Sequence, residues 1–525
     1  MDTFAKDRLP PQEQWPRLHF DLPELQYPAR LNCATVLLDD AIAEGHGDRP
    51  AILADAGAVS YRELLAQANR IANVLAALGV RPGNRVLLRG YNGAMLYAAW
   101  LAVMKTGAIA VTTMPMLRVP ELSAIMTKSR PAFALCDQRL VAELREAAAA
   151  TGESGTVVTW GDGDLEGRMA KASDRFANAD TASDDVCLLA FTSGTTGQPK
   201  ACMHFHRDVL AMADVVARHL LQTQPGDVYA GSPPLGFTFG LGALLVFPLR
   251  FRAASVPIEA PSPATILAAI EKHRVTCLFT APFAYRALAG EVQGRDVSSL
   301  RRCVSAGEFL PKAVSDLWHE KTGIRIIDGI GATEMIHIFI SAAGGDIRPG
   351  ATGRPLPGYR ACVLDEEGRE LPRGSTGRLA VTGPTGCRYL DDARQRDYVQ
   401  HGWNVTGDLY RVDEDGYFWF VARADDMIVS AGYNIAGPEV EWALLAHPAV
   451  RECAVIGAQD PERGTIVKAC IVLAPGRAGS PELVKELQDF VKQRIAPYKY
   501  PRAVEFLDAL PKTATGKLSR KALRK

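Results

Sequence analysis

The sequence has no excess of either charge and no close pair of cysteines. Its 59 Lys and Arg residues balance 59 Asp and Glu residues, so the formal net charge is zero. That balance gives no support to a nucleic-acid partner or to an anionic membrane surface. The ten cysteines are scattered, which excludes the spacing of a zinc ribbon or a redox dithiol. We therefore expect buried free thiols in a reducing compartment.

The sequence also lacks the marks of export and of membrane insertion. Its first residues have no apolar core behind a basic start, which argues against a secretory signal. The most apolar stretch, residues 95–104, is too short to span a bilayer and is followed by Lys105. We expect a cytoplasmic protein with no membrane partner, either a monomer or a homodimer.

What the sequence does contain is an alternation of helical and strand patterns. After an irregular arm that is rich in Pro and Arg and ends near residue 32, apolar residues recur at helical spacing between short apolar runs. This rhythm predicts an α/β fold with mostly parallel sheets and helices on both faces. The predicted helices are residues 61–78 and 94–104, and the predicted strands are residues 85–88, 108–111, 275–279 and 324–327.

Two changes of rhythm divide the rest of the chain. Residues 358–381 read as short strands broken by Gly, Pro and Asp, which indicates a small β-rich subdomain. After Arg423 the pattern changes to that of a small α+β domain. Its predicted helices are residues 438–445 and 483–492, and its predicted strands are residues 452–456 and 469–473.

A run of small hydroxyl residues and glycines ends in a lysine at residues 192–200. It follows an apolar strand, residues 186–190. Small residues let backbone N–H groups approach phosphate oxygens closely, and a lysine adds positive charge. The alternative is a polar turn between a strand and a helix. The candidate phosphate-binding residues are Thr192, Ser193, Gly194, Thr195, Thr196, Gly197 and Lys200.

The complete string, Thr-Ser-Gly-Thr-Thr-Gly-Gln-Pro-Lys, resembles the phosphate loop of the adenylate-forming enzymes. These include acyl- and aryl-CoA ligases, firefly luciferase and peptide-synthetase adenylation domains. The resemblance extends over most of the chain. Residues 329–334 look like the second nucleotide motif, in which Thr333 would contact phosphate and Glu334 would help to hold Mg²⁺. Without the other motifs, this segment would read as a helix start with an acidic first turn.

Two further motifs are implied for the nucleotide. Residues 406–409 resemble the ribose motif, in which Asp408 would accept hydrogen bonds from the ribose hydroxyls. Arg423 matches a second ribose contact. The resemblance also places Gly307 and Glu308 beside AMP.

The resemblance implies a C-terminal domain that moves between two half-reactions. Residues 1–424 would form the large AMP-binding domain with the acid and ATP sites, and residues 425–525 the small mobile domain. Lys517 would stabilise charge during adenylation, and Asp425 would be the hinge. Gly432 would let the pantetheine arm of coenzyme A pass close to the backbone. Ile330 and Asn434 depart from the Tyr and Arg of many relatives.

Residues near the second nucleotide motif limit which class of carboxylic acid the protein could activate. Acetate- and propionate-activating relatives place a Trp where Gly331 stands, which implies a larger acid here. No acidic residue occurs between residues 231 and 258 to pair an α-ammonium group, which argues against an amino acid.

Residues 333–339 closely resemble benzoate- and 2-aminobenzoate-CoA ligases. On a predicted helix, His337 would share a face with Thr333 and Glu334 and would point at the acid. The alternative is a histidine packed in the core or turned to solvent. We expect a benzoate-type acid in an acid pocket formed by Phe237, Ala306, Gly307, Gly329, Gly331, His337 and Ile338.

The function expected from the resemblance is ATP- and Mg²⁺-dependent ligation of an aryl acid to coenzyme A through an acyl-AMP. The alternatives are an adenylation enzyme that loads a separate carrier protein, a medium-chain acyl-CoA synthetase, and a catalytically inactive nucleotide-binding protein. No fused carrier is expected after Lys517. The nearby pair His204 and His206 suggests a metal site, but no acidic or cysteine ligand accompanies it in a known motif, so we expect a structural role.

Overall fold

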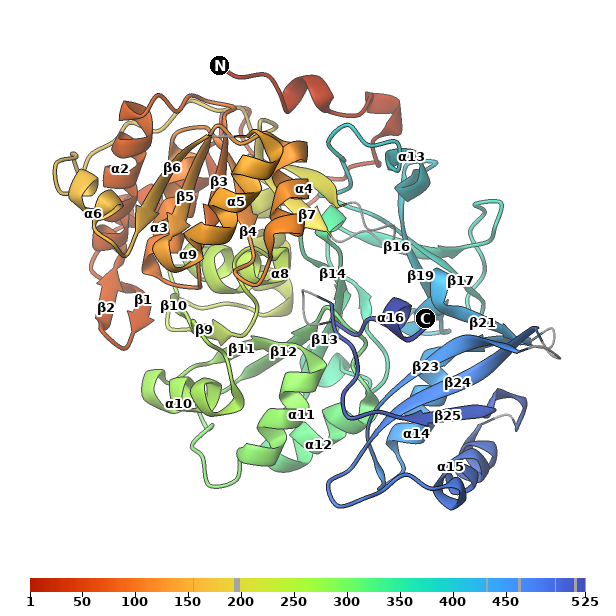
Figure 1. Ribbon diagram of the computed structural model, residues 1–525. Coiled ribbons are helices and arrows are strands. Elements are labelled where there is room, and N and C mark those ends of the chain that lie inside the picture. Colours follow the sequence, from red (N-terminus) through yellow and green to blue (C-terminus); the bar gives the residue numbers. More distant parts are fainter. Residues whose placement is uncertain are drawn as a thin grey trace.

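The computed structural model describes residues 1–153, 155–192, 199–430, 433–460, 464–495, 497–513 and 517–524, without the side chains of residues 425, 429, 433 and 434. The N-terminal arm consists of short 3-10 turns and extended segments along the top of the molecule (Figure 1). It is held by an ion pair between Asp2 and Arg85 and by the Phe4 ring, whose centroid lies 4.3 Å from the Arg85 guanidinium. The turns are η1 (Lys6–Arg8), η2 (Gln12–Gln14) and η3 (Pro23–Leu25).

The first sheet has the strand order β6-β5-β3-β4-β7-β8 and is parallel except at β8, which runs antiparallel to β7. Its strands are β3 (Arg85–Arg89), β4 (Ile109–Thr113), β5 (Phe133–Asp137), β6 (Thr156–Trp160), β7 (Val186–Thr192) and β8 (Lys200–Phe205). Helices surround it (Figure 1). They are α2 (Tyr61–Ala77), α3 (Ala94–Lys105), α4 (Val119–Ser129), α5 (Val141–Thr151), α6 (Asp164–Met169) and α7 (His206–Met212).

The second sheet has the order β15-β14-β13-β12-β11-β9-β10-β1-β2 and is parallel in its centre, from β1 to β13. Its strands are β1 (Pro50–Ala54), β2 (Gly57–Ser60), β9 (Val228–Gly231), β10 (Ala254–Val256), β11 (Cys277–Thr280), β12 (Arg302–Ala306), β13 (Ile326–Gly331), β14 (Ile338–Ser341) and β15 (Arg354–Pro355). The helices between and beside these strands are α1 (Asp40–Ala43), α8 (Thr238–Leu241), α9 (Phe247–Arg250), α10 (Pro263–His273), α11 (Pro282–Glu291) and α12 (Lys312–Thr322).

An antiparallel sheet follows, as the short strand patterns predict, and it extends to Arg423. It comprises β16 (Arg360–Leu364), β17 (Thr376–Thr382), β18 (Val399–Gln400), β19 (Trp403–Val412) and β20 (Phe418–Arg423), with α13 (Gln395–Tyr398) before β18. The C-terminal part lies beside it at the lower right of Figure 1. It contains β21 (Met427–Ser430), β22 (Tyr433–Ala436), β23 (Val450–Asp460), β24 (Gly464–Leu473), β25 (Ala503–Phe506), α14 (Gly437–Leu445), α15 (Pro481–Arg494) and α16 (Arg520–Leu523).

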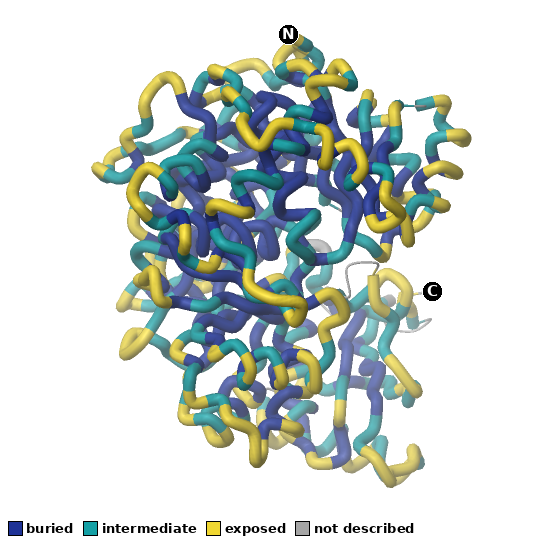
Figure 2. Tube along the Cα trace, turned by 90° about the vertical axis from the view of Figure 1, so that its left-hand side faces the viewer, coloured by how far each residue is buried: buried dark blue, intermediate teal, exposed yellow. Residues whose placement is uncertain are grey.

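Local sequence explains the clearest elements. Helix α2 begins at Tyr61 because Ser60 caps it: the Ser60 hydroxyl accepts the Glu63 N–H at 3.2 Å, and the Glu63 carboxylate accepts the Ser60 N–H at 2.7 Å. Buried segments run through the middle of the sheets and exposed ones lie on the rim (Figure 2). The predicted α/β fold class is confirmed. Among the described residues, no helix has the length and apolar character needed to cross a membrane.

Candidate functional site

Lys517 belongs to the C-terminal segment but lies against residues of the large N-terminal part. Its Cε lies 3.8 Å from the point that a Cβ on Gly307 would occupy, and Gly307 has a positive φ of 92°. Its ammonium nitrogen lies 5.3 Å from the centroid of the Phe237 ring. The following residue, Leu518, donates its N–H to the Glu308 carboxylate at 3.3 Å. Burial lowers the pKa of Lys517, and the negative charge of Glu308 opposes that shift. The ammonium is therefore poorly solvated and gains from any added anion.

The predicted phosphate loop joins two antiparallel strands. Thr192, the last residue of β7, is paired in register with Lys200, the first residue of β8. The two ends of the loop are thus held side by side at the edge of the first sheet. Ser193, Gly194, Thr195, Thr196 and Gly197 lie outside the described residues.

Lys200 and Glu334 are brought together by a third residue that the motifs did not reveal. The Lys200 ammonium donates to the Tyr389 hydroxyl at 2.8 Å, and that hydroxyl donates to the Glu334 carboxylate at 2.5 Å. Lys200 Nζ and Glu334 Oε1 are 3.6 Å apart. Burial raises the pKa of Tyr389, and the charge of Glu334 raises it further, so the hydroxyl keeps its proton. Tyr389 is 189 positions from Lys200 in the sequence, so no short motif could have predicted that the two residues are in contact.

Thr333 is held from behind by a buried polar chain. The His204 ring donates from Nε2 to the Thr333 carbonyl at 2.8 Å. The other ring nitrogen, Nδ1, faces Asp208 at 3.7 Å, and Asp208 accepts a hydrogen bond from Arg388 at 2.7 Å. Burial works to raise the pKa of Asp208, but the charge of Arg388, the contact with His204 and the charge of Arg207 together leave that pKa lowered. These contacts agree with the structural role expected for His204, which is to hold the backbone at Thr333 in place.

The predicted ribose pair forms across two neighbouring strands. Asp408 on β19 and Arg423 on β20 are paired in register, and the guanidinium donates to the carboxylate at 2.8 Å. Burial raises the pKa of Asp408, and the charge of Arg423 opposes that shift. Gly407 has a positive φ of 77°, and a Cβ there would lie 3.3 Å from the Arg423 guanidinium. Glycine thus leaves room for the pair.

The predicted acid-pocket residues come from two neighbouring parts of the second sheet and from the start of α8. Phe237 immediately precedes α8, and its ring centroid lies 6.5 Å from that of Phe239. Ala306 ends β12 and is 5% exposed. Gly329 lies against Ile338, because a Cβ on Gly329 would meet the Ile338 side chain at 2.7 Å. Ile338 is itself buried and packs as core.

Gly331 is required by the packing of β13 on the segment that leads to β14. A Cβ at this position would lie 2.9 Å from the carbonyl oxygen of His337. Real Cβ atoms do not approach a backbone oxygen so closely, so any larger side chain would displace the chain at His337. Backbone packing therefore explains why residue 331 is a glycine, whatever the size of the acid.

The predicted helix over residues 333–339 is wrong. Only Thr333–Met335 forms a 3-10 turn; Ile336 then has a φ of +64°, and the chain continues into β14. His337 consequently does not share a helix face with Thr333. Its ring lies between Phe239 and Phe247, at centroid distances of 5.6 and 4.6 Å. The pairing of β14 with β13 outweighs the local helical pattern.

The His337 ring is buried and neutral. Burial lowers the pKa of His337 to about 3, because a buried cation loses its hydration. Its Nε2 faces the Phe239 carbonyl oxygen at 3.4 Å. Among the described residues, its Nδ1 has no hydrogen-bond partner. The ring thus presents an uncharged, mostly aromatic surface behind Phe239.

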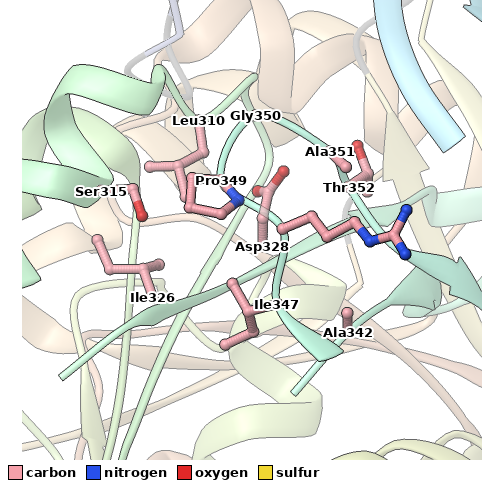
Figure 3. A pocket seen from close by; sticks show the side chains of 11 residues that line it. Leu310, Ser315, Ile326, Asp328, Ala342, Ile347, Pro349, Gly350, Ala351 and Thr352 are labelled. Atoms are coloured by element: carbon pink, nitrogen blue, oxygen red, sulfur yellow. The ribbon is translucent and has the colours of Figure 1, made fainter. Parts of the chain in front are cut away.

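Asp328, which the motif analysis missed, lies in a pocket two residues before Ile330. Its side chain points into the space between Pro349 and Thr352 (Figure 3). Burial raises the pKa of Asp328 well above its usual range. Thr352 lies 3.4 Å, hydroxyl to hydroxyl, from Tyr410, which is two residues after Asp408. The sequence did offer one signal for Asp328: an acidic residue at the end of an apolar strand pattern indicates a candidate functional residue.

His206 is part of a buried cluster with two cysteines that are distant in sequence. One ligand atom each from Cys33, Cys187 and His206 lie within 4.8 Å of one another. The His206 Nδ1 already accepts the Cys33 N–H at 3.2 Å, which engages the lone pair that a metal would need. Three enclosed ligands also fall short of the four of a structural zinc site. All ten cysteines are free and buried, as predicted.

The predicted hinge and thiol-transfer loop fall largely outside what the structure describes. Asp425 lies in the turn η10 (Ala424–Asp426), and its side chain is not described. Gly432 lies outside the described residues. The neighbouring Asp426 accepts a hydrogen bond from Arg524 at 2.6 Å, so the end of the chain is tied to this turn.

The comparisons with known proteins agree with these features. The model of the AMP-binding enzyme family matches residues 39–388, and the model of the AMP-binding enzyme C-terminal domain matches residues 439–517. The chain therefore belongs to the AMP-binding enzyme family. The resemblance to adenylate-forming enzymes is confirmed, and with it the expectation of an AMP-forming acid–CoA ligase.

Among individual relatives, benzoate–CoA ligase from Thauera aromatica is 36% identical over 96% of this chain and 97% of its own length. Mitochondrial acyl-coenzyme A synthetase ACSM3 from Mus musculus is 35% identical over 89% of this chain and 84% of its own. The solved anthranilate CoA ligase AuaEII in complex with anthranoyl-AMP has a TM-score of 0.91 at 34% identity, covering 96% of this chain and 98% of that one.

Proposed function

We propose that this protein is an ATP-dependent aryl-CoA ligase that activates a benzoate-type acid and transfers it to coenzyme A. The position of Lys517 carries the proposal. Its ammonium lies against Phe237 on the acid side, and it interacts electrostatically with Asp408 on the nucleotide side. These contacts support a role for this single cation between the carboxylate of the acid and the α-phosphate of ATP.

In the first half-reaction, the acid carboxylate attacks the α-phosphate of ATP and pyrophosphate leaves. Lys517 stabilises the negative charge that grows on the oxygens between the two substrates. A positioned charge in a site with little water is effective because it needs no reorganisation during the reaction. Burial lowers the pKa of Lys517, because the charged ammonium loses part of its hydration.

The phosphates of ATP would be held by the ends of the phosphate loop, Thr192 and Lys200, and by Thr333. Glu334 is 6% exposed and would hold Mg²⁺ together with phosphate oxygens. One carboxylate fits that ion, since Mg²⁺ in nucleotide sites takes few protein ligands and the rest from phosphates and water. When bound, Mg²⁺ neutralises charge on the departing pyrophosphate.

The nucleoside would lie along the ribose pair and the pocket of Asp328. Asp408 has carboxylate oxygens to accept hydrogen bonds from ribose hydroxyls, with Arg423 beside it. Gly307 and Glu308 would lie beside the same nucleoside. The Asp328 carboxyl would accept a hydrogen bond from the exocyclic amino group of the base.

For the second half-reaction, the domain boundary is proposed at residues 424 and 425. Rotation about Asp425 would withdraw Lys517 and bring the segment around Gly432 to the acyl-AMP. The coenzyme A thiol then attacks the acyl carbonyl and AMP leaves. The contacts of Lys517 and Leu518 with residues 307 and 308 support an arrangement suited to adenylation.

The acid side supports an aromatic substrate. Phe237, Phe239 and the neutral His337 ring offer flat apolar surfaces, which suit the faces and edges of a ring. Benzoate and 2-aminobenzoate are the favoured acids. The benzoate ligase and the anthranoyl-AMP complex among the relatives support this choice.

The test is pyrophosphate release and thioester formation over benzoate, 2-aminobenzoate, hydroxybenzoates and medium-chain fatty acids. We expect kcat/KM for the preferred aryl acid to exceed that for octanoate by at least about tenfold, a modest difference in pocket contacts. A preference for octanoate would instead identify a medium-chain acyl-CoA synthetase. Pyrophosphate release without transfer to free coenzyme A would indicate loading of a carrier protein.

A further inference from the structure

Tyr389 reaches the nucleotide site from a segment outside the recognised motifs. Residues 388–390 run along the outer side of β8, where Leu390 donates its N–H to Ala201 at 2.9 Å and Met203 donates to Arg388 at 2.7 Å. The segment therefore adds a further extended stretch to the first sheet, on the side of β8 that faces away from β7. Its tyrosine is placed by backbone pairing next to Lys200.

The Tyr389 ring is fixed independently of the charges that it contacts. Its ring centroid lies 5.9 Å from that of Tyr398 at an angle of 68°, and its N–H donates to the Gln395 side chain at 2.8 Å. Tyr389 is 1% exposed. Because packing fixes the ring, the position of its hydroxyl does not depend on Lys200 or Glu334.

The hydroxyl occupies the place of a direct ion pair. An ammonium and a carboxylate in contact lie about 2.7–2.9 Å apart, whereas Lys200 Nζ and Glu334 Oε1 are 3.6 Å apart. Tyr389 accepts from the lysine and donates to the carboxylate. A direct pair would use the charge that the phosphates of ATP need and an oxygen that Mg²⁺ needs.

We propose that Tyr389 is a positioning residue that keeps Lys200 and Glu334 apart, so that both remain available to Mg·ATP. This proposal rests on the proposed function, because it assumes that Lys200 serves the phosphates and Glu334 serves Mg²⁺. Binding of Mg·ATP then replaces two hydrogen bonds to a neutral hydroxyl and a 3.6 Å ion pair, instead of breaking a closer, hydrogen-bonded ion pair. Tyr389, which we call the spacer, should affect nucleotide binding and adenylation. It should not affect binding of the acid or transfer to the thiol.

The test compares Tyr389→Phe with Tyr398→Phe. Both variants remove one hydroxyl from the same buried ring pair. The Tyr398 hydroxyl has no hydrogen-bond partner among the described residues, so it serves as the matched control. For Tyr389→Phe we expect a KM for Mg·ATP about tenfold higher, equivalent to about 1.4 kcal/mol, and a higher Mg²⁺ concentration at half-maximal rate. The KM for the acid and thioester formation from supplied acyl-AMP should stay near wild type.

A double-mutant cycle with Glu334→Gln isolates the mechanism. A neutral amide cannot form an ion pair with Lys200, so Tyr389→Phe should cost little further Mg·ATP affinity in that background. Additive losses would overturn the proposal. So would equal behaviour of Tyr389→Phe and Tyr398→Phe, or an equal loss in both half-reactions.

Mg·ATP affinity measured by calorimetry separates this proposal from the proposed function. That measurement needs no acid, so it reports on the spacer even if every acid tested fails. Wild type that binds Mg·ATP but activates no aryl acid would contradict the proposed substrate alone. Tyr389→Phe with wild-type Mg·ATP affinity and wild-type Mg²⁺ dependence would contradict the spacer alone.

Discussion

The nucleotide side of the site is built from paired charges, whereas the acid side is built from rings and aliphatic surface. Asp408 pairs with Arg423, and Lys200 reaches Glu334 through a hydroxyl. On the acid side, the Phe239 ring packs against the neutral ring of His337. Charged side chains that bind a ligand need other partners while the ligand is absent, because a buried unpaired charge is costly. Apolar surfaces need none, and they select by shape.

A third kind of charge lies deeper and serves neither ligand. Arg388 and Asp208 are both fully buried and are bonded at 2.7 Å. Their position behind His204 and Thr333 indicates that they support the floor of the nucleotide side. Changing this pair should therefore affect the stability of the protein as well as its activity.

The largest effect is expected from Asp208→Asn. The amide keeps the shape of the carboxylate but leaves the Arg388 guanidinium buried without a counter-charge, which costs about 3–5 kcal/mol of the free energy of unfolding. Urea denaturation followed by circular dichroism measures this loss. Asp180→Asn is the control, because its pair with Arg30 is exposed and water screens it, so the substitution should change stability little. Similar losses in the two variants would contradict the structural role.

Lys517→Ala tests the cation shared by the two sides. Removing the ammonium should slow adenylation by about 10²–10³-fold, as expected for the loss of one group that stabilises charge in the transition state. Thioester formation from supplied acyl-AMP should be largely retained. Lys512→Ala is the control, since this exposed lysine lies over the Phe283 ring, 4.6 Å from its centroid. Equal loss of both half-reactions in Lys517→Ala would refute the division of roles.

The neutral ring on the acid side predicts a pH dependence of stability. The pKa of His337 is about 3 in the folded protein and about 6.5 when unfolded. The unfolded chain therefore binds the proton first as the pH falls, and the folded state loses stability between pH 6.5 and 3. Between pH 7 and pH 5 the loss is about 2 kcal/mol. In urea titrations, His337→Gln should lose correspondingly less over this range; equal losses would show that His337 is not the titrating group.

The contrast between the two sides also explains what the sequence could predict. The helix predicted at residues 61–78 is observed as Tyr61–Ala77, and the strand predicted at residues 85–88 as Arg85–Arg89. Local periodicity and capping determine such elements. On the nucleotide side, Asp408 and Arg423 lie in short motifs, and antiparallel pairing brings them together.

The parts that could not be predicted depend on distant packing. Residues 333–339 have a helical pattern, but Ile336 adopts a positive φ and the chain joins β14. Pairing with β13 and burial of the His337 ring decide that conformation, and neither is visible in local sequence. Tyr389 was missed for the same reason, since it gains its role from a strand 189 residues away. Asp328 had a local signal, its place in a buried strand, but the pocket around it is formed by the distant 349–352 loop.

The smallest effect is expected on the acid side alone. His337→Ala removes the ring that supports Phe239, so the KM for the aromatic acid should rise by about tenfold, as expected for about 1.4 kcal/mol of lost contacts. The KM for ATP should change little, because the ring does not contact the charged pairs. Phe247→Leu is the matched control: Phe247 packs on His337 from the other side, and leucine keeps much of its apolar volume. Steady-state kinetics with benzoate, 2-aminobenzoate and octanoate measure these changes. An unchanged profile of acids in His337→Ala would remove this residue from the acid pocket, and a parallel rise in both KM values would erase the distinction between the two sides.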